Sequence, residues 1–358
     1  MTAAPDHGRN PTITDVAHRA GVSTATVSKV LNSRWGVAEA TSRRVQQAID
    51  GLGYEPSLAA RHLRGTTTDR MIGVLYSQLG PWEGEVLKGV AEEAGGSCHR
   101  LLTFSAADRR SGAGWEHRAL ARLGGSLIDG AILVAPTDHT AAGSLPTVAI
   151  MPQGRAAGLD VIRSDERGAG ELATAHLVEL GHRRIAYLGR ADGLHPSPHE
   201  VGHRDALRRA GIELDRDLVR YEATADAAAR AVHTLQGLAD PPTAVVASDD
   251  ELALAVHTAA GGAQRLSVVG SGGSAGTVDA AAAAGLTTLS QRPHEMGRAA
   301  FVTLRAAVRL RAVIGSGAPE PREVLVPAEL VVRSSTWPPV VRSAVHPERV
   351  TATLDTLR

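Results

Sequence analysis

The chain has 358 residues, of which 43% are hydrophobic, so it is long enough to form two or three separately packed domains. Its 38 basic and 38 acidic residues cancel, which excludes a protein drawn to nucleic acid or membranes by overall charge; any such surface has to be local. A single cysteine, Cys98, excludes an internal disulfide and a zinc ribbon. Because no secretory signal and no run of about 18 apolar residues is evident, we expect a cytoplasmic protein.

The first part of the chain predicts a small all-helical unit. Residues 1–11 are expected to be disordered, whereas 12–56 hold short helical segments broken by turn signals, with no strand-like run. The predicted segments are ITDVAHRA (13–20), STATVSKVLN (23–32) and ATSRRVQQAIDGLGY (40–54).

The first two segments have the pattern of a helix-turn-helix. Gly21 supplies the turn between them, and Ser23 is a natural N-terminal cap for the second helix. Each helix also has an apolar face that can be buried against the other. The residues of the two faces are Val16, Ala17 and Ala20 in the first helix, and Val27, Val30 and Leu31 in the second.

The opposite face of the second helix suits the major groove of DNA, because it combines short hydroxyls, a methyl group and a long hydrogen-bond donor. These side chains belong to Thr24, Ala25, Ser28, Lys29 and Asn32. Residues 13–64 hold seven basic and four acidic residues, so the neutral chain keeps a modestly basic head. Sequence-specific DNA binding is one interpretation of this surface, and an ordinary three-helix bundle with a polar face is the other.

Residues 57–70 are predicted to be a hinge helix and linker between this head and a region of a different kind. From Met71 onward, short β-branched runs alternate with amphipathic stretches, which is typical of doubly wound parallel sheets. Such runs are MIGVLY (71–76), EGEVLKGVAEEA (83–94), LIDGAILVAP (127–136), GAGELATAHLVEL (168–180), RIAYLG (184–189), TAVVAS (243–248), LSVVGSG (266–272) and HEMGRAAFVTLRAAV (294–308). The number of elements exceeds one such sheet, so we expect two α/β lobes with a ligand between them. Residues 337–358 are predicted to be a frayed tail, with one short amphipathic helix as the alternative.

The stretches TITDVAHRAGVSTATVSKVLN (12–32) and VAEATSRRVQQAIDGLGYEPSLAARHLR (37–64) resemble the DNA-binding head of the LacI/GalR family of bacterial transcription regulators. The similarity continues at HLVELGHRRIAYLG (176–189), GLTTLSQ (285–291) and EVLVPAELVVRSST (323–336). The resemblance implies that the second helix and a hinge helix at 57–64 contact DNA, with Leu63 wedged into the minor groove of a palindromic operator read by a homodimer. The DNA-contacting residues it implies are Thr14, Ser23, Thr24, Ala25, Thr26, Ser28, Lys29, Asn32, Tyr54, Arg61, Leu63 and Arg64.

The resemblance also implies that residues 71–336 form an effector-binding and dimerisation domain of the periplasmic-binding-protein type. Its first lobe is expected at about 71–163 and 293–322, and its second at about 164–291 and 323–336. The chain would cross between lobes near 162–165, 290–294 and 322–326. Family members of this type commonly close their lobes on sugars or purines, so we expect a repressor whose DNA affinity responds to a small molecule.

The stretch HEVGH (199–203) has the HExxH pattern of zinc proteases, in which the two histidines bind the metal and Glu200 acts as general base. The resemblance implies instead the start of a helix that faces the cleft, with His199 where relatives commonly carry an effector-binding arginine. A second departure follows the LSVV strand, where relatives carry an acidic residue and this chain has Gly270, Ser271, Gly272 and Gly273. Losing a cation and an anion together changes the chemistry expected of the pocket.

Three interpretations of the pocket stay open: an altered site for an unusual effector, a degenerate site without effector response, and a metal-sensing site using His195, His199 and His203. Prolines at 196 and 198 interrupt the helix between the first two histidines, which disfavours the metal site. The effector-binding candidates are Trp82, Asp165, His195, His199 and Ser248. GSGGSAG (270–276) lacks the Lys-Ser/Thr ending of a P-loop and is predicted to be a surface loop. No catalytic residue, metal or cofactor is expected, and a metal-dependent hydrolase remains the enzyme alternative.

Overall fold

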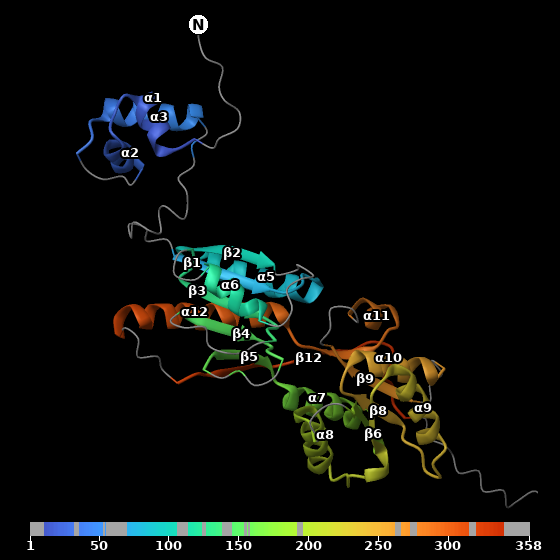
Figure 1. Cartoon of the computed structure of the whole chain (residues 1–358). Coiled ribbons are helices and arrows are strands. Elements are labelled where there is room, and N and C mark those ends of the chain that lie inside the picture. The colour runs from blue at the N-terminus through green and yellow to red at the C-terminus, as the bar shows by residue number, and fades with distance from the viewer. Residues whose placement is uncertain are drawn as a thin grey trace, which may run out of the picture.

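The chain forms a helical head and two α/β lobes, shown in Figure 1. This computed structural model describes residues 11–31, 36–52, 54, 70–105, 114–123, 127–137, 145–153, 156, 158–191, 196–261, 266–272, 278–314 and 320–339. Over these residues, no helix combines the length and the apolar character needed to cross a membrane.

The head contains three helices, α1 (Ile13–Ala20), α2 (Thr24–Leu31) and α3 (Glu39–Leu52). Thr12 starts α1 by a reciprocal cap, in which its side chain accepts from the Asp15 N–H and the Asp15 carboxylate accepts from the Thr12 N–H at 2.7 Å. Gly21 ends α1 in a left-handed conformation, at φ 65°, which a residue without a side chain adopts freely. These local signals place the turn of the predicted helix-turn-helix where the sequence indicated it.

The core of the head is small and comes from all three helices. Val16, Val27 and Val45 are fully buried in it, and Tyr54 packs against its edge. The apolar faces predicted for α1 and α2 therefore meet α3, which fixes the exposed side of α2.

The first lobe is built on a six-stranded sheet with the strand order β11-β5-β4-β3-β1-β2, all parallel. Its strands are β1 (Arg70–Tyr76), β2 (His99–Ser105), β3 (Gly130–Val134), β4 (Thr147–Ile150), β5 (Asp160–Ser164) and β11 (Glu323–Val326). The helices that cover it are α5 (Pro81–Gly95), α6 (Trp115–Leu123) and α12 (Pro293–Ile314). Its central strands β1, β3 and β4 are nearly continuous apolar runs because both faces of the sheet are covered.

The second lobe repeats this architecture with the strand order β12-β10-β9-β8-β6-β7. Its strands are β6 (Ile185–Arg190), β7 (Val219–Glu222), β8 (Ala244–Ala247), β9 (Ser267–Ser271), β10 (Thr287–Ser290) and β12 (Glu329–Val331). Its helices are α7 (Glu166–Glu179), α8 (Pro198–Arg209), the short η1 (Arg216–Leu218), α9 (Ala225–Gln236), α10 (Asp250–Ala259) and α11 (Val278–Ala283). Only β12 runs antiparallel to its neighbour within this sheet. The predicted fold class is confirmed.

Two boundaries of the expected lobes need correction. The segment 323–326 was expected in the second lobe, but as β11 it pairs with β5 of the first sheet, with Val326 opposite Ser164. The third crossing therefore lies between Val326 and Glu329, because the parallel pairing with β5 holds the chain in the first lobe for four more residues. Trp337 was assigned to the tail, yet its N–H donates to Ser267 Oγ at 3.1 Å and its carbonyl accepts from that hydroxyl at 3.0 Å, which ties it to the second lobe.

Each lobe contains a pair of helices that touch through glycine. In the second lobe, a Cβ added at Gly202 of α8 would lie 1.9 Å from the carbonyl oxygen of Arg167 in α7, and one at Gly170 would lie 1.9 Å from the carbonyl oxygen of His199. In the first lobe, Gly297 of α12 meets the Val86 carbonyl of α5 in the same way, at 2.1 Å. The two helices concerned begin with similar sequences, PHEVG (198–202) and PHEMG (293–297). The glycine of HEVGH is thus required for helix packing.

Candidate DNA-binding and ligand-binding sites

The exposed face of α2 carries the side chains that the sequence predicts for the major groove. Thr24, Ala25 and Lys29 are exposed, whereas Val27 between them is fully buried. Ser23 accepts a hydrogen bond from the Thr26 N–H at 3.2 Å, so the predicted cap begins the helix and orients its first turn. The helix therefore presents two small groups and one long cation on a surface that the fold leaves free.

The other predicted DNA contacts differ in exposure. Thr14 is exposed on α1, while Thr26 and Ser28 are half-buried. Tyr54 is half-buried against the core of the head, and its N–H donates to the Ile49 carbonyl at 3.1 Å. Four predicted contacts, Asn32, Arg61, Leu63 and Arg64, lie outside the described residues, as does the effector candidate His195.

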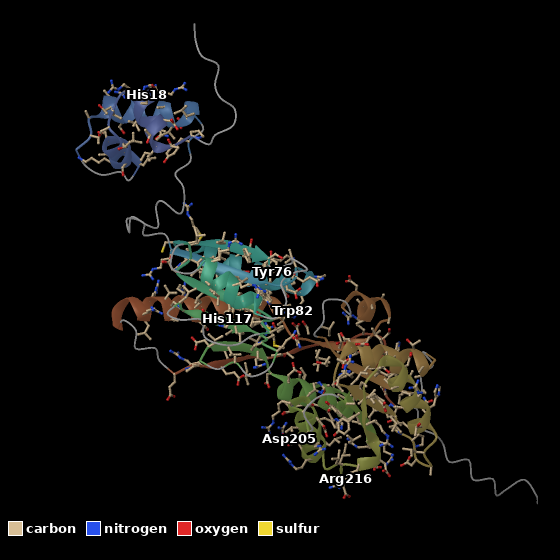
Figure 2. All side chains as sticks on the ribbon, in the orientation of Figure 1. His18, Tyr76, Trp82, His117, Asp205 and Arg216 are labelled. Atoms are coloured by element: carbon tan, nitrogen blue, oxygen red, sulfur yellow. The ribbon has the colours of Figure 1, made fainter. Side chains whose placement is uncertain are left out.

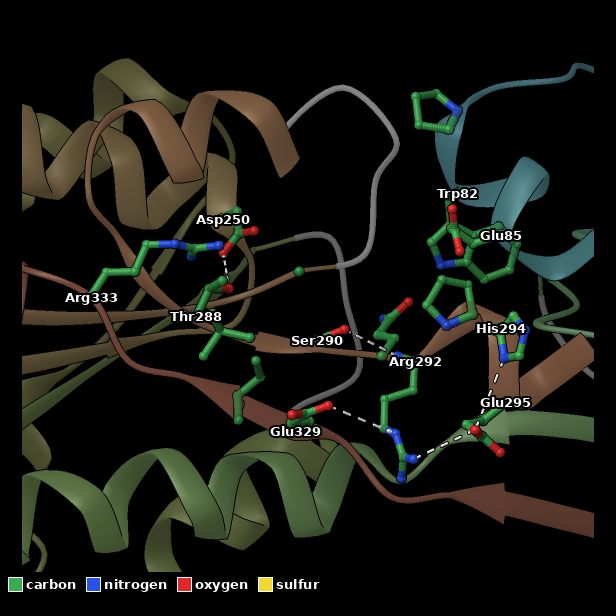
Figure 3. A pocket seen from close by; sticks show the side chains of 16 residues that line it. Trp82, Glu85, Asp250, Thr288, Ser290, Arg292, His294, Glu295, Glu329 and Arg333 are labelled. Atoms are coloured by element: carbon green, nitrogen blue, oxygen red, sulfur yellow. Dashed lines mark hydrogen bonds and ion pairs between the residues drawn. The ribbon is translucent and has the colours of Figure 1, made fainter. Parts of the chain in front are cut away.

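A cavity of about 590 Å³ lies between the two lobes. Figure 3 shows Trp82 and Glu85, from the start of α5, on one wall, and Asp250 and Thr288 of the second lobe on the other. The remaining wall comes from the starts of α5 and α12, from the end of β10 and the crossing after it, and from Gly272, β12 and the residue Arg333 beyond it. The residues of this wall are Pro81, Gly272, Leu289, Ser290, Gln291, Arg292, Pro293, His294, Glu295, Glu329, Val331 and Arg333. A molecule in this cavity would touch both lobes and two of the three crossings.

Asp250 is the most buried charged group of the cavity wall, with 2% of its surface exposed. Thr288 donates a hydrogen bond to its Oδ1 at 2.5 Å, whereas its Oδ2 has no hydrogen-bond partner among the described residues. Burial raises the pKa of Asp250 to about 6, against the hydrogen bond from Thr288, which lowers it. A buried carboxylate oxygen without a partner is costly to keep, which marks this position as a binding group.

Two glycines make room for this carboxylate. A Cβ at Gly270 would lie 2.3 Å from Asp250 Oδ1, and one at Gly272 would lie 3.3 Å from Oδ2. The sequence indicated that a carboxylate was missing at 272. The structure shows that Asp250 supplies a carboxylate beside Gly272 instead, so the pocket keeps an anion.

Both guanidinium groups of the cavity wall are already engaged. Arg292, on the second crossing, lies 3.7 Å from Glu295 and 4.0 Å from Glu329, which stands beside the third crossing. Arg333 donates to the Leu286 carbonyl at 2.6 Å. Figure 3 shows the two ion pairs of Arg292, with Glu295 and with Glu329. Arg292 also holds a positive φ of 53°, which is unfavourable for a residue with a side chain and occurs where surrounding contacts impose it.

Among the predicted effector residues, the structure places one on the wall of this cavity. Trp82, labelled in Figure 2, lies at the end of the first lobe that faces the second, and its indole Nε1 is buried without a partner among the described residues. Asp165 instead caps α7, where its side chain accepts from the Gly168 N–H at 2.9 Å. Ser248 donates to Asp249 at 3.2 Å and is not among the residues that line the cavity.

His199 was expected to point into the cleft, and the structure corrects this. The side chain is 3% exposed, its ring lies 5.9 Å from the ring of Tyr187, and it is absent from the residues that line the cavity. The reason is the contact between α7 and α8 at Gly170 and Gly202, which brings the first turn of α8 against α7. Burial lowers the pKa of His199 to about 4, so this side chain is neutral near pH 7.

Glu200 and His203 of HEVGH have hydrogen-bond partners within the lobe. The Glu200 carboxylate is fully buried and accepts from the Tyr221 hydroxyl at 2.9 Å and from Arg204. Nδ1 of His203 lies 2.8 Å from the Thr174 hydroxyl, and burial lowers the pKa of His203 to about 3. Within the described ranges, no three His, Cys, Asp or Glu side chains are placed to hold a metal ion. A general base has to reach water, and Glu200 is committed to two neighbours instead.

The sequence interpretation missed Asp250, Thr288, Arg292 and Arg333. One signal was available for Asp250, because it lies in the segment that follows β8, and ligands bind at the carboxyl ends of the strands of a parallel sheet. The positions of the other three in the cavity depend on which segments meet in the folded chain, which the periodicity of the sequence does not show.

Comparison with known proteins matches both parts of the chain. Residues 12–57 match the family model described as "Bacterial regulatory proteins, lacI family", and residues 174–336 match a periplasmic binding protein-like domain. The regulator CelR of Thermobifida fusca is 34% identical over 263 residues, covering 69% of this chain and 75% of CelR. The repressor PurR of Vibrio atlanticus is 35% identical over 68% of this chain and 75% of its own length. The ribose operon repressor of Escherichia coli is 30% identical over 69% of this chain and 77% of its own length.

Solved structures show the same fold. A Lac repressor dimer bound to operator and the anti-inducer ONPF superimposes with a TM-score of 0.69 and 24% identity, covering 92% of this chain and all of the other. A complex of the regulator CelR with cellobiose superimposes with a TM-score of 0.54 and 27% identity, over 91% of this chain and all of the other.

Proposed function

This chain belongs to the LacI family of bacterial regulatory proteins, and on that premise we propose that it is a repressor which binds a palindromic operator as a homodimer and responds to a small molecule held between its lobes. It is a sequence-specific DNA-binding transcription regulator and not an enzyme. Its site of action is the cytoplasm. The observation that carries the proposal is the exposed face of α2, built as a recognition surface on a folded helix-turn-helix head.

Recognition of DNA would proceed from the second helix of the head. Thr24 and Ala25, at its start, would reach base edges, and Lys29 one turn later would donate to base or phosphate oxygens. Thr14, Ser23, Thr26, Ser28, Asn32 and Tyr54 would position the head on the DNA backbone, and Arg61, Leu63 and Arg64 would act as the hinge contacts. Because one head buries little surface, a dimer reading two half-sites would be needed for high affinity.

The interlobe cavity would couple the ligand to DNA. A ligand touching both walls binds best at one relative orientation of the lobes, so it shifts the population toward that orientation. By linkage, a ligand that favours the DNA-binding arrangement strengthens operator binding, and one that favours the other weakens it. CelR, one of the relatives, is recorded in complex with cellobiose, which supports a small-molecule ligand for this chain. Of the effector candidates, Trp82 is retained in this proposal, and Asp250 joins it.

The direct test is selection of operator sequences from random duplex DNA by the purified full chain, with and without a panel of sugars, nucleosides and divalent metals. We expect a palindromic sequence whose affinity changes with one class of compound. Failure to enrich any palindrome would contradict the proposal. If a palindrome is selected but no compound changes the affinity for it, DNA recognition is supported and the response to a small molecule is contradicted.

Replacing Lys29 by alanine is expected to weaken binding to the selected operator by about 10- to 100-fold, because each good contact to a base or phosphate contributes about 1–3 kcal/mol. The measurement is a fluorescence anisotropy titration against operator and against a scrambled duplex at fixed salt. Lys88→Ala is the matched control, since Lys88 is an exposed lysine on α5 of the first lobe. Equal operator affinities for Lys29→Ala and Lys88→Ala would show that the Lys29 side chain does not contact the operator.

A further inference from the structure

Arginines gather at the end of the first lobe that lies away from the cavity. Arg70 and His99 are the first residues of β1 and β2 and lie opposite each other in the parallel pairing of these strands. Arg305 and Arg309 belong to the second half of α12, which Figure 1 shows running from the crossing between the lobes to the far end of the first lobe. At about 1.5 Å per residue, Arg309 lies about 20 Å along the helix from His294 of the cavity wall. The cluster is therefore separate from the ligand site.

Contacts around Phe301 hold these side chains at one place. The ring of His99 meets the Phe301 ring edge-on, with 5.5 Å between the ring centres. The guanidinium of Arg305 lies 6.0 Å from the centre of the same Phe301 ring. Arg70 donates to the Val308 carbonyl of α12 at 3.4 Å, so the start of β1 is joined to this helix. The strands and the helix thus bring their arginines to one surface.

The electrostatics at His99 report the positive charge of this surface. Burial is the main cause that lowers the pKa of His99, and the charges of the three arginines Arg70, Arg305 and Arg309 lower it further. The carboxylate of Asp129 acts in the opposite direction, and its Oδ2 accepts from a backbone N–H of β1 at 2.7 Å. With three guanidinium groups against this carboxylate, the surface has an excess of positive charge.

Arginines on α12 differ in whether the fold compensates their charge. Arg298 donates to the Glu93 carboxylate of α5 at 2.8 Å. Two turns later, Arg305 and the exposed Arg309 have no carboxylate partner among the described residues, although like charges four residues apart on a helix repel each other. The negative end of the helix accounts for Arg311 in the last turn, but this effect fades beyond that turn. Arg305 and Arg309 are therefore left to an anion from outside the lobe.

The duplex is the polyanion that this chain would hold closest to the cluster. Arg70 directly follows the predicted linker, and six residues separate it from Arg64, the last of the proposed hinge contacts. Six residues span at most about 20 Å, so the start of β1 stays close to any duplex that the hinge contacts. Duplex DNA carries one negative charge per about 1.7 Å of its axis, so this tether would present phosphates to the first lobe at a high local concentration.

We propose that Arg70, Arg305 and Arg309 form a second DNA-contacting surface, on the first lobe, which binds backbone phosphates of the duplex held by the head and hinge. This inference rests on the proposed function, because the head and hinge bring the duplex to the lobe. Arg305 and Arg309 donate to phosphate oxygens, and Arg70 adds the N–H groups that the Val308 carbonyl leaves free. Phosphates carry no direct sequence information, so this surface adds affinity and salt dependence and leaves base recognition to α2.

The test is a fluorescence anisotropy titration of the full chain, over a range of salt concentrations, against the selected operator extended by about one helical turn at each end. Arg305→Gln with Arg309→Gln removes two cations from each subunit of a dimer. The slope of log Kd against log salt is therefore expected to fall in magnitude by about 2–4. Affinities for the operator and for a scrambled duplex are expected to fall together, by about 10-fold or more at low salt, because the lost contacts are to phosphates.

Three further variants separate charge from folding. Arg216→Gln with Arg230→Gln is the matched control, since both are exposed arginines of the second lobe, and it is expected to keep the slope. Arg305→Lys with Arg309→Lys keeps the charge and is expected to keep most of the slope. Arg309→Gln alone changes an exposed side chain and leaves the contact of Arg305 with Phe301, and about half of the change in slope is expected. Urea unfolding checks that each variant is folded.

The outcomes distinguish this surface from the operator binding on which it rests. If folded Arg305→Gln with Arg309→Gln keeps the slope of the natural chain, the first lobe does not bind phosphates and the proposal is wrong. An acidic protein that binds the cluster while the slope on DNA stays unchanged would equally contradict it. A natural chain that selects no operator would instead count against the proposed function.

Discussion

Replacing Gly202 by alanine is expected to lower the free energy of unfolding by about 3 kcal/mol, because the new methyl group would lie 1.9 Å from the backbone carbonyl oxygen of Arg167. A flexible side chain can move away from such a contact, but a carbonyl within helix α7 cannot move without shifting the helix. The two helices would separate, and the packing of Leu177 and Leu207 in the core of the second lobe would be lost with them. The measurement is urea unfolding followed by circular dichroism.

The matched control is Gly84→Ala. Gly84 also lies within a helix, α5, but a Cβ added there has no neighbour within 4 Å. We expect this variant to be unchanged or more stable by about 0.5–1 kcal/mol, because alanine restricts the unfolded chain and favours the helix. Equal stabilities for the two variants would show that α7 and α8 do not touch as described.

Lowering the pH from 7 to 5 is expected to reduce the free energy of unfolding by about 4 kcal/mol through two buried histidines alone. Burial lowers the pKa of His199 to about 4 and that of His203 to about 3, both below the value near 6.5 of an unfolded chain. The unfolded state therefore binds more protons than the folded state below pH 6.5. The contribution of the two histidines to the free energy of unfolding is therefore fully present above pH 6.5. It is lost as the pH falls toward their folded-state pKa values of about 4 and 3.

This pH dependence is measured by urea unfolding at several pH values between 5 and 7.5. His203→Phe is expected to reduce the slope by about 1.4 kcal/mol per pH unit at the acidic end, because one titrating group is removed from the buried pair. The variant leaves Thr174 with its hydrogen bond to the Gly170 carbonyl at 2.8 Å. His233→Gln, which changes an exposed histidine of α9, serves as the control and is expected to keep the slope. A slope unaffected by His203→Phe would mean that this ring is hydrated in the folded protein.

The hydrolase alternative for HEVGH fails because of where its residues pack. Glu200 bonds Tyr221 and Arg204, His203 bonds Thr174, and Gly202 lies against α7. The same residue types at the same spacing would suit a metal on an exposed helix face. In this protein, the HEVGH pattern therefore marks a helix whose glycine allows it to pack closely against α7. The two histidines are buried beside that helix contact.

The sequence by itself determined the local structure of this protein. Thr12 with Asp15, Gly21 and Ser23 fix the ends of the first two helices through contacts within three residues, so the helix-turn-helix and its exposed face could be predicted. The alternation of apolar runs with amphipathic stretches likewise determined two parallel-sheet lobes, because each element buries a face that its own spacing defines.

Only the tertiary structure decided the composition of the cavity. Asp250 and Thr288 are 38 residues apart, and Arg292 meets Glu329 only because the second and third crossings lie side by side. His199 has the spacing of a cleft residue, yet the crossing of α7 over α8 turns it inward. The physical reason is that periodicity gives the buried side of a helix but not which neighbour covers it, and the pairing of β11 with β5, or of one crossing with another, depends on contacts between segments far apart in the chain.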